Sequence, residues 1–181
     1  DCAIDYLKSR NKSEKPFILF LSWGPPHNPY QSAPQEFCDL YRPEDIPLRP
    51  NVPEEAKAQA KTDLAGYYAH VSALDFQLGK LMSAVKASGI EENTIFIYTS
   101  DHGDMLGSHG YTRKQKPWDE SILVPFLLRF PAQLGEQART VDVPFCTQDI
   151  LPTLLDFCDI PIPESAEGVS FAGHLNGGKA P

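Results

Sequence analysis

Acidic, imidazole and glycine residues are concentrated in one short stretch of the chain, residues 98–110 (YTSDHGDMLGSHG). Asp101 and His102 come directly after an apolar run, so a predicted strand presents them at its end. A carboxylate oxygen suits hard cations, and an imidazole nitrogen extends the choice toward zinc. These residue types therefore fit a divalent-cation site. The alternative is that Asp101 caps the next turn and His102 is a surface residue.

A second polar cluster follows another apolar run. Residues 16–23 (PFILFLSW) are predicted to form a strand buried on both faces, and Pro25, Pro26 and His27 come directly after it. In open α/β sheets, ligands bind outside the carboxyl ends of the strands. We therefore expect His27 to lie at the same edge of the sheet as the acid and imidazole at 101 and 102.

The elements that must position these residues alternate along the chain. The clearest helix spans residues 54–89, where leucine, valine and tyrosine recur at spacings of three and four. Strands are predicted at residues 94–100 and 124–130, and a further helix at 147–158. This order predicts an α/β fold with a largely parallel sheet flanked by helices.

Length, composition and charge restrict the function. The 181 residues fit one domain, and 41% hydrophobic with 22% charged residues is ordinary globular composition. A net charge of −8 argues against binding to nucleic acid or to anionic membranes, which requires a basic face. No apolar run approaches the roughly 18 residues of a membrane span, and the first 16 residues do not form a targeting segment. The four cysteines lack metal-site spacing and are expected to be thiols or to form an incidental disulfide: Cys2, Cys38, Cys146 and Cys158.

Several features follow one another in residues 100–129: SDHG, LGSHG, Lys114, Trp118, DES and VPFLLR. In this order they resemble the sulfatase family of the alkaline-phosphatase-like superfamily. Sulfatases carry Ser-Asp-His-Gly after a buried strand, then Leu-Gly-x-His-Gly, an active-site lysine, an aromatic residue before acid-Glu-Ser, and Val-Pro at the next strand. The segments LSWGPPHNPYQSAP and DILPTLL are also similar to segments of sulfatases, so the resemblance covers nearly the whole chain.

The resemblance implies a role for each matching residue. Asp101 and His102 would be ligands of a divalent cation, usually calcium in this family, with magnesium or zinc as alternatives. His27 would contact the sulfate or the leaving oxygen, and Lys114 the sulfate. Lys116 is a competing candidate, but only Lys114 keeps the family's spacing. The implied substrate is a small sulfate ester or a sulfated glycan, and the implied location is periplasmic, secreted or lysosomal.

One departure from the family pattern concerns the nucleophile. Sulfatases use a formylglycine made from the Cys or Ser of a Cys/Ser-x-Pro-x-Arg motif, and no cysteine or serine here has that context. The family's paired aspartates, which complete the metal site, also have no counterpart before Pro16. Residues 1–181 are therefore expected to be the C-terminal portion of a single sulfatase domain. Alone, this portion is expected to bind calcium weakly, to hydrolyse no sulfate ester and to self-associate through uncovered apolar surface.

Two other functions remain alternatives. A metal-dependent phosphodiesterase or phosphonate hydrolase of the same superfamily also uses an Asp-His pair after a strand. A noncatalytic α/β module could hold a structural ion in the same loop. The other three histidines have no expected catalytic role. His70 is expected to be in the core or half-buried next to the apolar residues of the long helix, His109 to orient its loop by hydrogen bonding, and His174 to lie in the tail.

Overall fold

The structure, a computed structural model, describes residues 2–10 and 15–181. The chain forms two compact units. The first contains the residues up to Glu91 together with Ile97–Leu128, and the second contains Glu92–Phe96 and Arg129–Pro181. Each unit is described by itself. All of the residues predicted to do chemistry lie in the first.

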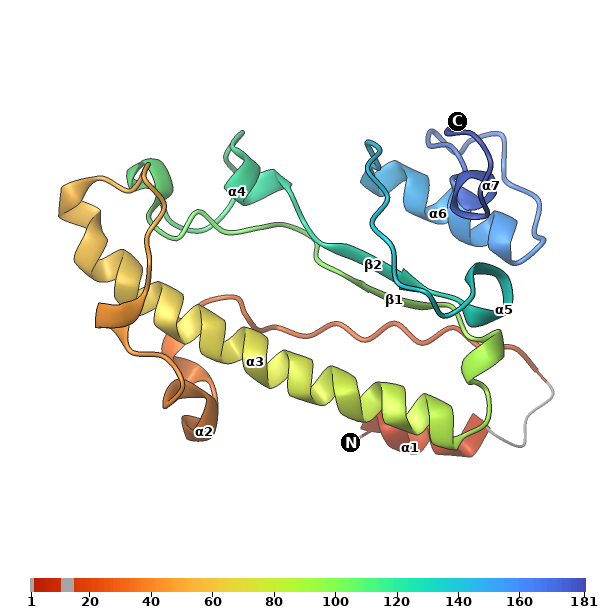
Figure 1. The fold of residues 1–181 in the computed structure, drawn as a ribbon, viewed down its shortest axis with the longest axis horizontal. Helices are drawn as coiled ribbons and strands as arrows, with labels where there is room; N and C mark the ends of the chain where they lie inside the picture. The colour runs from red at the N-terminus through yellow and green to blue at the C-terminus, as the bar shows by residue number, and fades with distance from the viewer. Residues whose placement is uncertain (1, 11–14) are drawn as a thin grey trace. The chain divides into compact units, whose positions relative to one another are not determined.

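The first unit is organised around the long helix α3 (Lys57–Ala87), which follows the 3-10 turn η3 (Glu54–Ala56) (Figure 1). The prediction of this helix is confirmed, and Gly89 ends it with a φ of +68°. Its buried residues are mostly small or apolar: Ala60, Ala65, Gly66, Ala69, His70, Leu74, Leu81, Ala84 and Val85. Val71, one of the valines at the predicted spacing of three and four, is instead 39% exposed.

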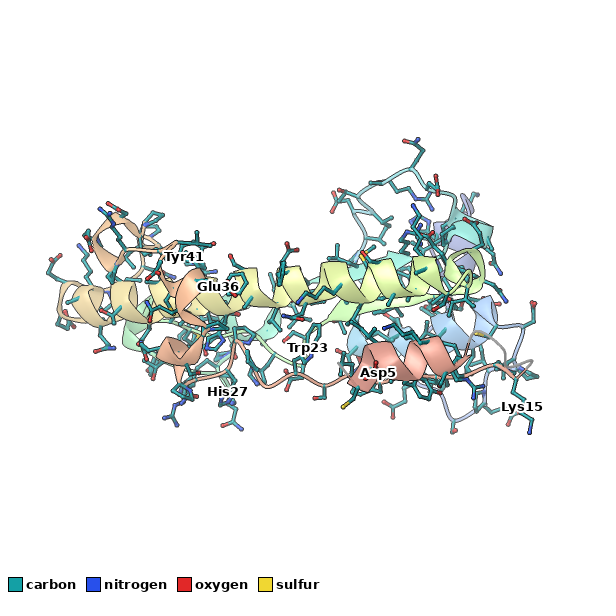
Figure 2. All side chains as sticks on the ribbon, turned by 90° about the horizontal axis from the view of Figure 1, so that it is seen from below. Asp5, Lys15, Trp23, His27, Glu36 and Tyr41 are labelled. Atoms are coloured by element: carbon teal, nitrogen blue, oxygen red, sulfur yellow. The ribbon has the colours of Figure 1, made fainter. Side chains whose placement is uncertain are left out.

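Short helices pack along α3: α1 (Cys2–Arg10), η1 (Tyr30–Ser32), α2 (Gln35–Cys38) and η2 (Pro43–Asp45). Figure 2 labels Glu36 of α2, and Tyr41, along α3. The Tyr41 hydroxyl lies 2.7 Å from Ser72 Oγ of α3. Nε2 of His70, a buried residue of α3, lies 3.3 Å from the Pro29 carbonyl oxygen. The core position predicted for His70 is confirmed, and α3 thereby holds the proline-rich residues 24–53 in place.

Strands β1 (Phe96–Thr99) and β2 (Phe126–Arg129) form a two-stranded sheet. Both predicted strands are confirmed within their ranges. Their directions are antiparallel (Figure 1), so the expectation of a largely parallel sheet is not met by any strand pairing among the described residues. What is confirmed is the coarser assignment, a partial α/β domain. The elements between the strands are η5 (Ser108–Gly110) and α4 (Asp119–Ile122).

The prediction of a buried strand at residues 16–23 is wrong for this structure. The segment is extended but pairs with no strand in the described part of the chain, and Ile18 and Phe20 are 94% and 90% exposed. An apolar run supplies side chains suited to a sheet, but a strand also requires backbone partners from a neighbour. Figure 2 shows Trp23 and His27 at one end of this segment and Lys15 at the other. The self-association expected through apolar surface left uncovered on the chain stays a prediction.

The second unit is mainly helical, with α5 (Pro131–Leu134), α6 (Thr147–Phe157) and α7 (Ala172–Leu175); the turn η4 (Glu91–Asn93) begins at the end of the first unit. The predicted helix at 147–158 is confirmed. Asp149 is buried and accepts hydrogen bonds from the backbone N–H groups of Cys146 (2.8 Å) and Val169 (2.9 Å). This carboxylate therefore ties the start of α6 to the loop before α7.

All four cysteines have free thiols, so the incidental disulfide that the sequence allowed is not formed. Among residues 2–10 and 15–181, no helix is both long enough and apolar enough to span a membrane. The prediction that the first 16 residues are not a targeting segment falls partly on residues 1 and 11–14, which lie outside the described residues.

Candidate active site

His27 lies in a turn directly after the extended segment, closed by a hydrogen bond of 3.1 Å from its backbone N–H to the Gly24 carbonyl. Its Nδ1 lies 2.9 Å from the Asn28 carbonyl oxygen, and its Nε2 contacts Nζ of Lys114. A carbonyl only accepts and an ammonium only donates hydrogen bonds. Both contacts are therefore satisfied by an imidazole with its proton on Nδ1 and a lone pair on Nε2.

Asp101 and His102 occupy the turn that follows β1. Nδ1 of His102 lies 2.7 Å from the Gly103 carbonyl oxygen, and in a neutral imidazole this contact places the lone pair on Nε2, 3.5 Å from Oδ2 of Asp101. The Asp101 side chain is 85% exposed and that of His102 30%. A carboxylate oxygen and an imidazole lone pair are therefore adjacent and open to solvent, a pair that a divalent cation can use.

These two clusters lie next to each other. The ring centroids of His27 and His102 are 6.2 Å apart, with an interplanar angle of 68°. The structure thus brings the four predicted site residues into one series of neighbours: Lys114, His27, His102 and Asp101. Their catalytic and metal-binding roles stay predictions. In the described part of the chain, no group of three or more His, Cys, Asp or Glu side chains could hold a metal ion.

Glycine at position 103 allows the loop carrying Asp101 and His102 to approach α4. The Gly103 N–H donates to the Ser121 carbonyl at 2.8 Å, and a Cβ at Gly103 would lie 2.1 Å from the Glu120 carbonyl oxygen. Any side chain here would force the two loops apart. Close packing against α4 therefore explains why a glycine follows the Asp-His pair.

Lys114 belongs to a loop that two backbone hydrogen bonds hold against residues 103–108. The Met105 N–H donates to the Arg113 carbonyl at 2.7 Å, and the Gly107 N–H donates to the Tyr111 carbonyl at 2.8 Å. Of the two candidate lysines, Lys114 contacts His27, whereas Nζ of Lys116 lies 4.6 Å from the Tyr111 ring centroid. The tertiary contacts therefore place only Lys114 beside the imidazole.

Sequence reasoning missed an anchor formed by Asn51. Asn51 Nδ2 donates to Glu120 Oε1 at 2.8 Å and lies 3.1 Å from His109 Nε2, while the His109 N–H donates to the Asn51 carbonyl at 2.9 Å. Arg49 lies 3.5 Å from the same Glu120 oxygen. Glu120 belongs to the DES segment of the family resemblance. No local sequence pattern identifies Asn51, because its hydrogen-bonding partners are 58 and 69 residues away.

The anchor lowers the pKa of Glu120 below its ordinary value of 4.5, chiefly through the hydrogen bond from Asn51, with smaller contributions from Ser108 and the Arg49 charge. We expect Asn51→Ala to raise the pKa of Glu120 toward 4.5. Because folding lowers this pKa, the stabilising contribution is complete above pH 4.5 and is lost as the pH falls through the lowered value. Carbon-detected NMR titration of the Glu120 carboxyl measures the change, with exposed Asn176→Ala as the control. An unchanged Glu120 titration in Asn51→Ala would contradict the assignment.

A second anchor, also missed, lies beside the site. Buried Tyr30 donates a hydrogen bond of 2.7 Å to Asp104 Oδ2, and Asp104 Oδ1 accepts from the Leu106 N–H at 3.2 Å. Burial first, and the Asp104 carboxylate second, raise the pKa of Tyr30 far above its ordinary value. The hydroxyl therefore stays protonated and fixes the 101–106 loop to η1 near the start of α3.

Comparison with known proteins adds a family assignment to this geometry. The profile of the family described as Sulfatase matches residues 1–160. An ulvan-active sulfatase of Formosa agariphila is 43% identical over 168 residues, which cover 92% of this chain and 33% of that protein. The chain spans about a third of the length of the curated relatives it matches.

Solved structures agree with this assignment. A Bacteroides fragilis protein described as a sulfatase has a TM-score of 0.89 and 27% identity, covering 99% of this chain and 40% of that one. The phosphonate monoester hydrolase of Agrobacterium radiobacter has a TM-score of 0.86 and 25% identity, covering 98% and 42%. A protein solved with its substrate D-glucosamine-2-N,6-O-disulfate has a TM-score of 0.59 and 29% identity, covering 73% and 27%.

Proposed function

Because the chain belongs to the sulfatase family, we propose that it supplies the sulfate-binding residues and part of the metal site of an enzyme that hydrolyses sulfate monoesters. The observation that carries this proposal is the contact between Lys114 and His27 beside the ring of His102. Side chains from three loops meet there, and the Lys114 ammonium among them has the positive charge and the donors that a sulfo group requires.

Lys114 and His27 would bind the substrate's oxygens. Hydrolysis of a sulfate ester builds negative charge on the nonbridging oxygens and on the leaving oxygen, and fixed donors aimed at these atoms stabilise that charge. The Lys114 ammonium can direct its remaining protons to a nonbridging oxygen. His27 would donate to the anion only with a proton on Nε2, the nitrogen that accepts from Lys114 in the structure.

Asp101 and His102 would hold the divalent cation. The Asp101 carboxylate fits calcium in kind, whereas the His102 imidazole nitrogen, 3.5 Å from it, is a ligand that zinc prefers. The pair does not fit calcium in number, because calcium takes about six to eight oxygen ligands. When bound, the cation would act as a Lewis acid on a sulfate oxygen. We propose calcium as the ion, with further ligands supplied by the part of the enzyme that carries the nucleophile.

The nucleophile is proposed to lie outside this sequence. In the family it is a formylglycine made from Cys or Ser in Cys/Ser-x-Pro-x-Arg, and that motif does not occur in the 181 residues. We therefore propose that the chain is the C-terminal portion of a catalytic domain and hydrolyses no sulfate ester by itself. Its substrate class would be a small sulfate ester or a sulfated sugar, as in the neighbour solved with a disulfated glucosamine.

A phosphonate monoester hydrolase is the second candidate, because one such enzyme matches 98% of the chain with a TM-score of 0.86. A phosphonate monoester, like a sulfate monoester, carries a negatively charged tetrahedral group, so the same cationic residues would suit it. The sulfatase relative, 43% identical, favours the sulfate ester.

The test is an NMR titration of the five histidine rings with sodium sulfate in the presence of calcium. We expect the His27 and His102 resonances to move saturably, whereas His70 and His174 stay in place. Lys114→Gln should weaken sulfate binding about 10- to 100-fold, because it removes a charge-assisted hydrogen bond. Lys80→Gln, on α3, is the control.

Two outcomes would contradict the proposal. Sulfate could move the His27 resonance no more than chloride does at equal ionic strength, which would mean that no anion site exists. Methylphosphonate could instead bind much more tightly than methyl sulfate, which would favour the phosphonate hydrolase.

A further inference from the structure

Three aromatic rings are stacked in the loop that carries Lys114. The Trp118 ring lies 4.8 Å from that of His109 and 5.2 Å from that of Tyr111, with interplanar angles of 21° and 28°. Nζ of Lys116 lies over the Tyr111 ring, 4.6 Å from its centroid. His109 is exposed, Tyr111 is 42% exposed and Trp118 is half-buried. We call these three rings with Lys116 the aromatic stack.

The loop does not depend on these rings alone for its conformation. Backbone hydrogen bonds join Gly103 to Ser121 and Met105 to Arg113, and the Lys116 N–H reaches Ser121 Oγ at 3.3 Å. Aromatic rings exposed on a loop that already has such support often belong to a binding site. The stack therefore presents exposed aromatic atoms of His109 and Tyr111 to solvent together with an ammonium group.

The stack is close to the proposed sulfate-binding lysine. An extended chain spans at most about 3.6 Å per residue, so the Cα atoms of Tyr111 and Trp118 lie within about 11 Å and 14 Å of that of Lys114. A short oligosaccharide covers such a distance. Residues 111–118 also carry three basic residues, Arg113, Lys114 and Lys116, and no acidic one, in a chain of net charge −8.

We propose that the aromatic stack is a subsite for a pyranose ring of a sulfated oligosaccharide whose scissile sulfate lies at His27 and Lys114. The C–H groups on one face of a sugar carry partial positive charge, which suits the negative face of an aromatic ring. Lys116 pairs with an anionic group on that sugar. This inference rests on the proposed function and adds to it the residues that select a sugar substrate.

The experiment measures binding of glucosamine-2-N,6-O-disulfate to the purified chain, with the Trp118 indole and Tyr111 ring resonances as reporters. We expect the sugar to move both and to bind more tightly than inorganic sulfate. Tyr111→Ala should weaken sugar binding about five- to tenfold and leave inorganic sulfate binding within about twofold. Lys116→Ala should give a similar loss and serves as the second variant if Tyr111→Ala fails to fold.

Two controls match these variants closely. Tyr6→Ala removes another exposed tyrosine that packs against an aromatic edge and a guanidinium group, and Lys80→Ala removes another ammonium that lies over an aromatic ring, that of Phe76. Neither should change sugar binding.

The outcomes separate this inference from the proposed function. If inorganic sulfate moves the His27 ring but the sugar binds no more tightly than sulfate, or if Tyr111→Ala and Tyr6→Ala behave alike, the subsite is overturned and the sulfate site stands. If 4-nitrophenyl sulfate moves Trp118 more than the sugar does at equal occupancy, the stack takes aromatic groups and the sugar assignment is wrong. If no sulfate compound moves His27, the proposed function itself has failed.

Discussion

Replacing Lys114 by alanine in a protein that carries the whole catalytic domain is expected to lower kcat/KM for an aryl sulfate by about 100- to 1,000-fold. The ammonium is the fixed positive charge beside His27, and it would act on charge that grows in the transition state. Its loss should therefore reduce kcat as well as raise KM. Steady-state kinetics with 4-nitrophenyl sulfate measure both.

The control for this prediction is Lys80→Ala, which removes an ammonium from the C-terminal half of α3 and should leave the kinetics unchanged. Lys114→Arg keeps the charge but changes its geometry, and we expect it to recover only part of the lost rate. If kcat/KM of Lys114→Ala stays within about threefold of that of the unchanged enzyme, the lysine is a solvated surface group.

Gly66→Ala is expected to destabilise the chain by about 1–3 kcal/mol, although alanine favours helices. A Cβ at Gly66 would lie 2.3 Å from the carbonyl oxygen of Tyr30 and 2.7 Å from its carbonyl carbon. These are backbone atoms, so the η1 segment would have to move away from α3. Because Tyr30 also holds Asp104, the displacement should extend to the candidate site.

Gly79→Ala is the matched control, since it lies in the same helix and a Cβ there would meet nothing within 4 Å. It should stabilise the chain by about 0.5–1 kcal/mol, because alanine loses less backbone entropy than glycine on folding. Chemical denaturation followed by circular dichroism gives both free energies of unfolding. Equal effects of the two substitutions would mean that α3 and η1 do not pack as the structure has them.

The helices and the motif residues could be predicted from the sequence because their signals are local. The three-to-four spacing of apolar residues predicted α3, and short apolar runs predicted β1 and β2. The same signal failed at residues 16–23, where the apolar run is present but no described strand pairs with it. The predicted parallel direction of the strands was wrong for the same reason, because strand pairing depends on residues that are distant in the sequence.

By itself, then, the sequence determined the family, the long helix and the identities of Asp101, His102, His27 and Lys114 as candidates, since motif order and periodicity are properties of neighbouring residues. Only the tertiary structure decided that Lys114 contacts His27, that Asn51 holds Glu120, and that the rings of His109, Tyr111 and Trp118 stack. These contacts join residues as far as 87 positions apart. Their formation depends on how the whole first unit packs, which no local pattern encodes.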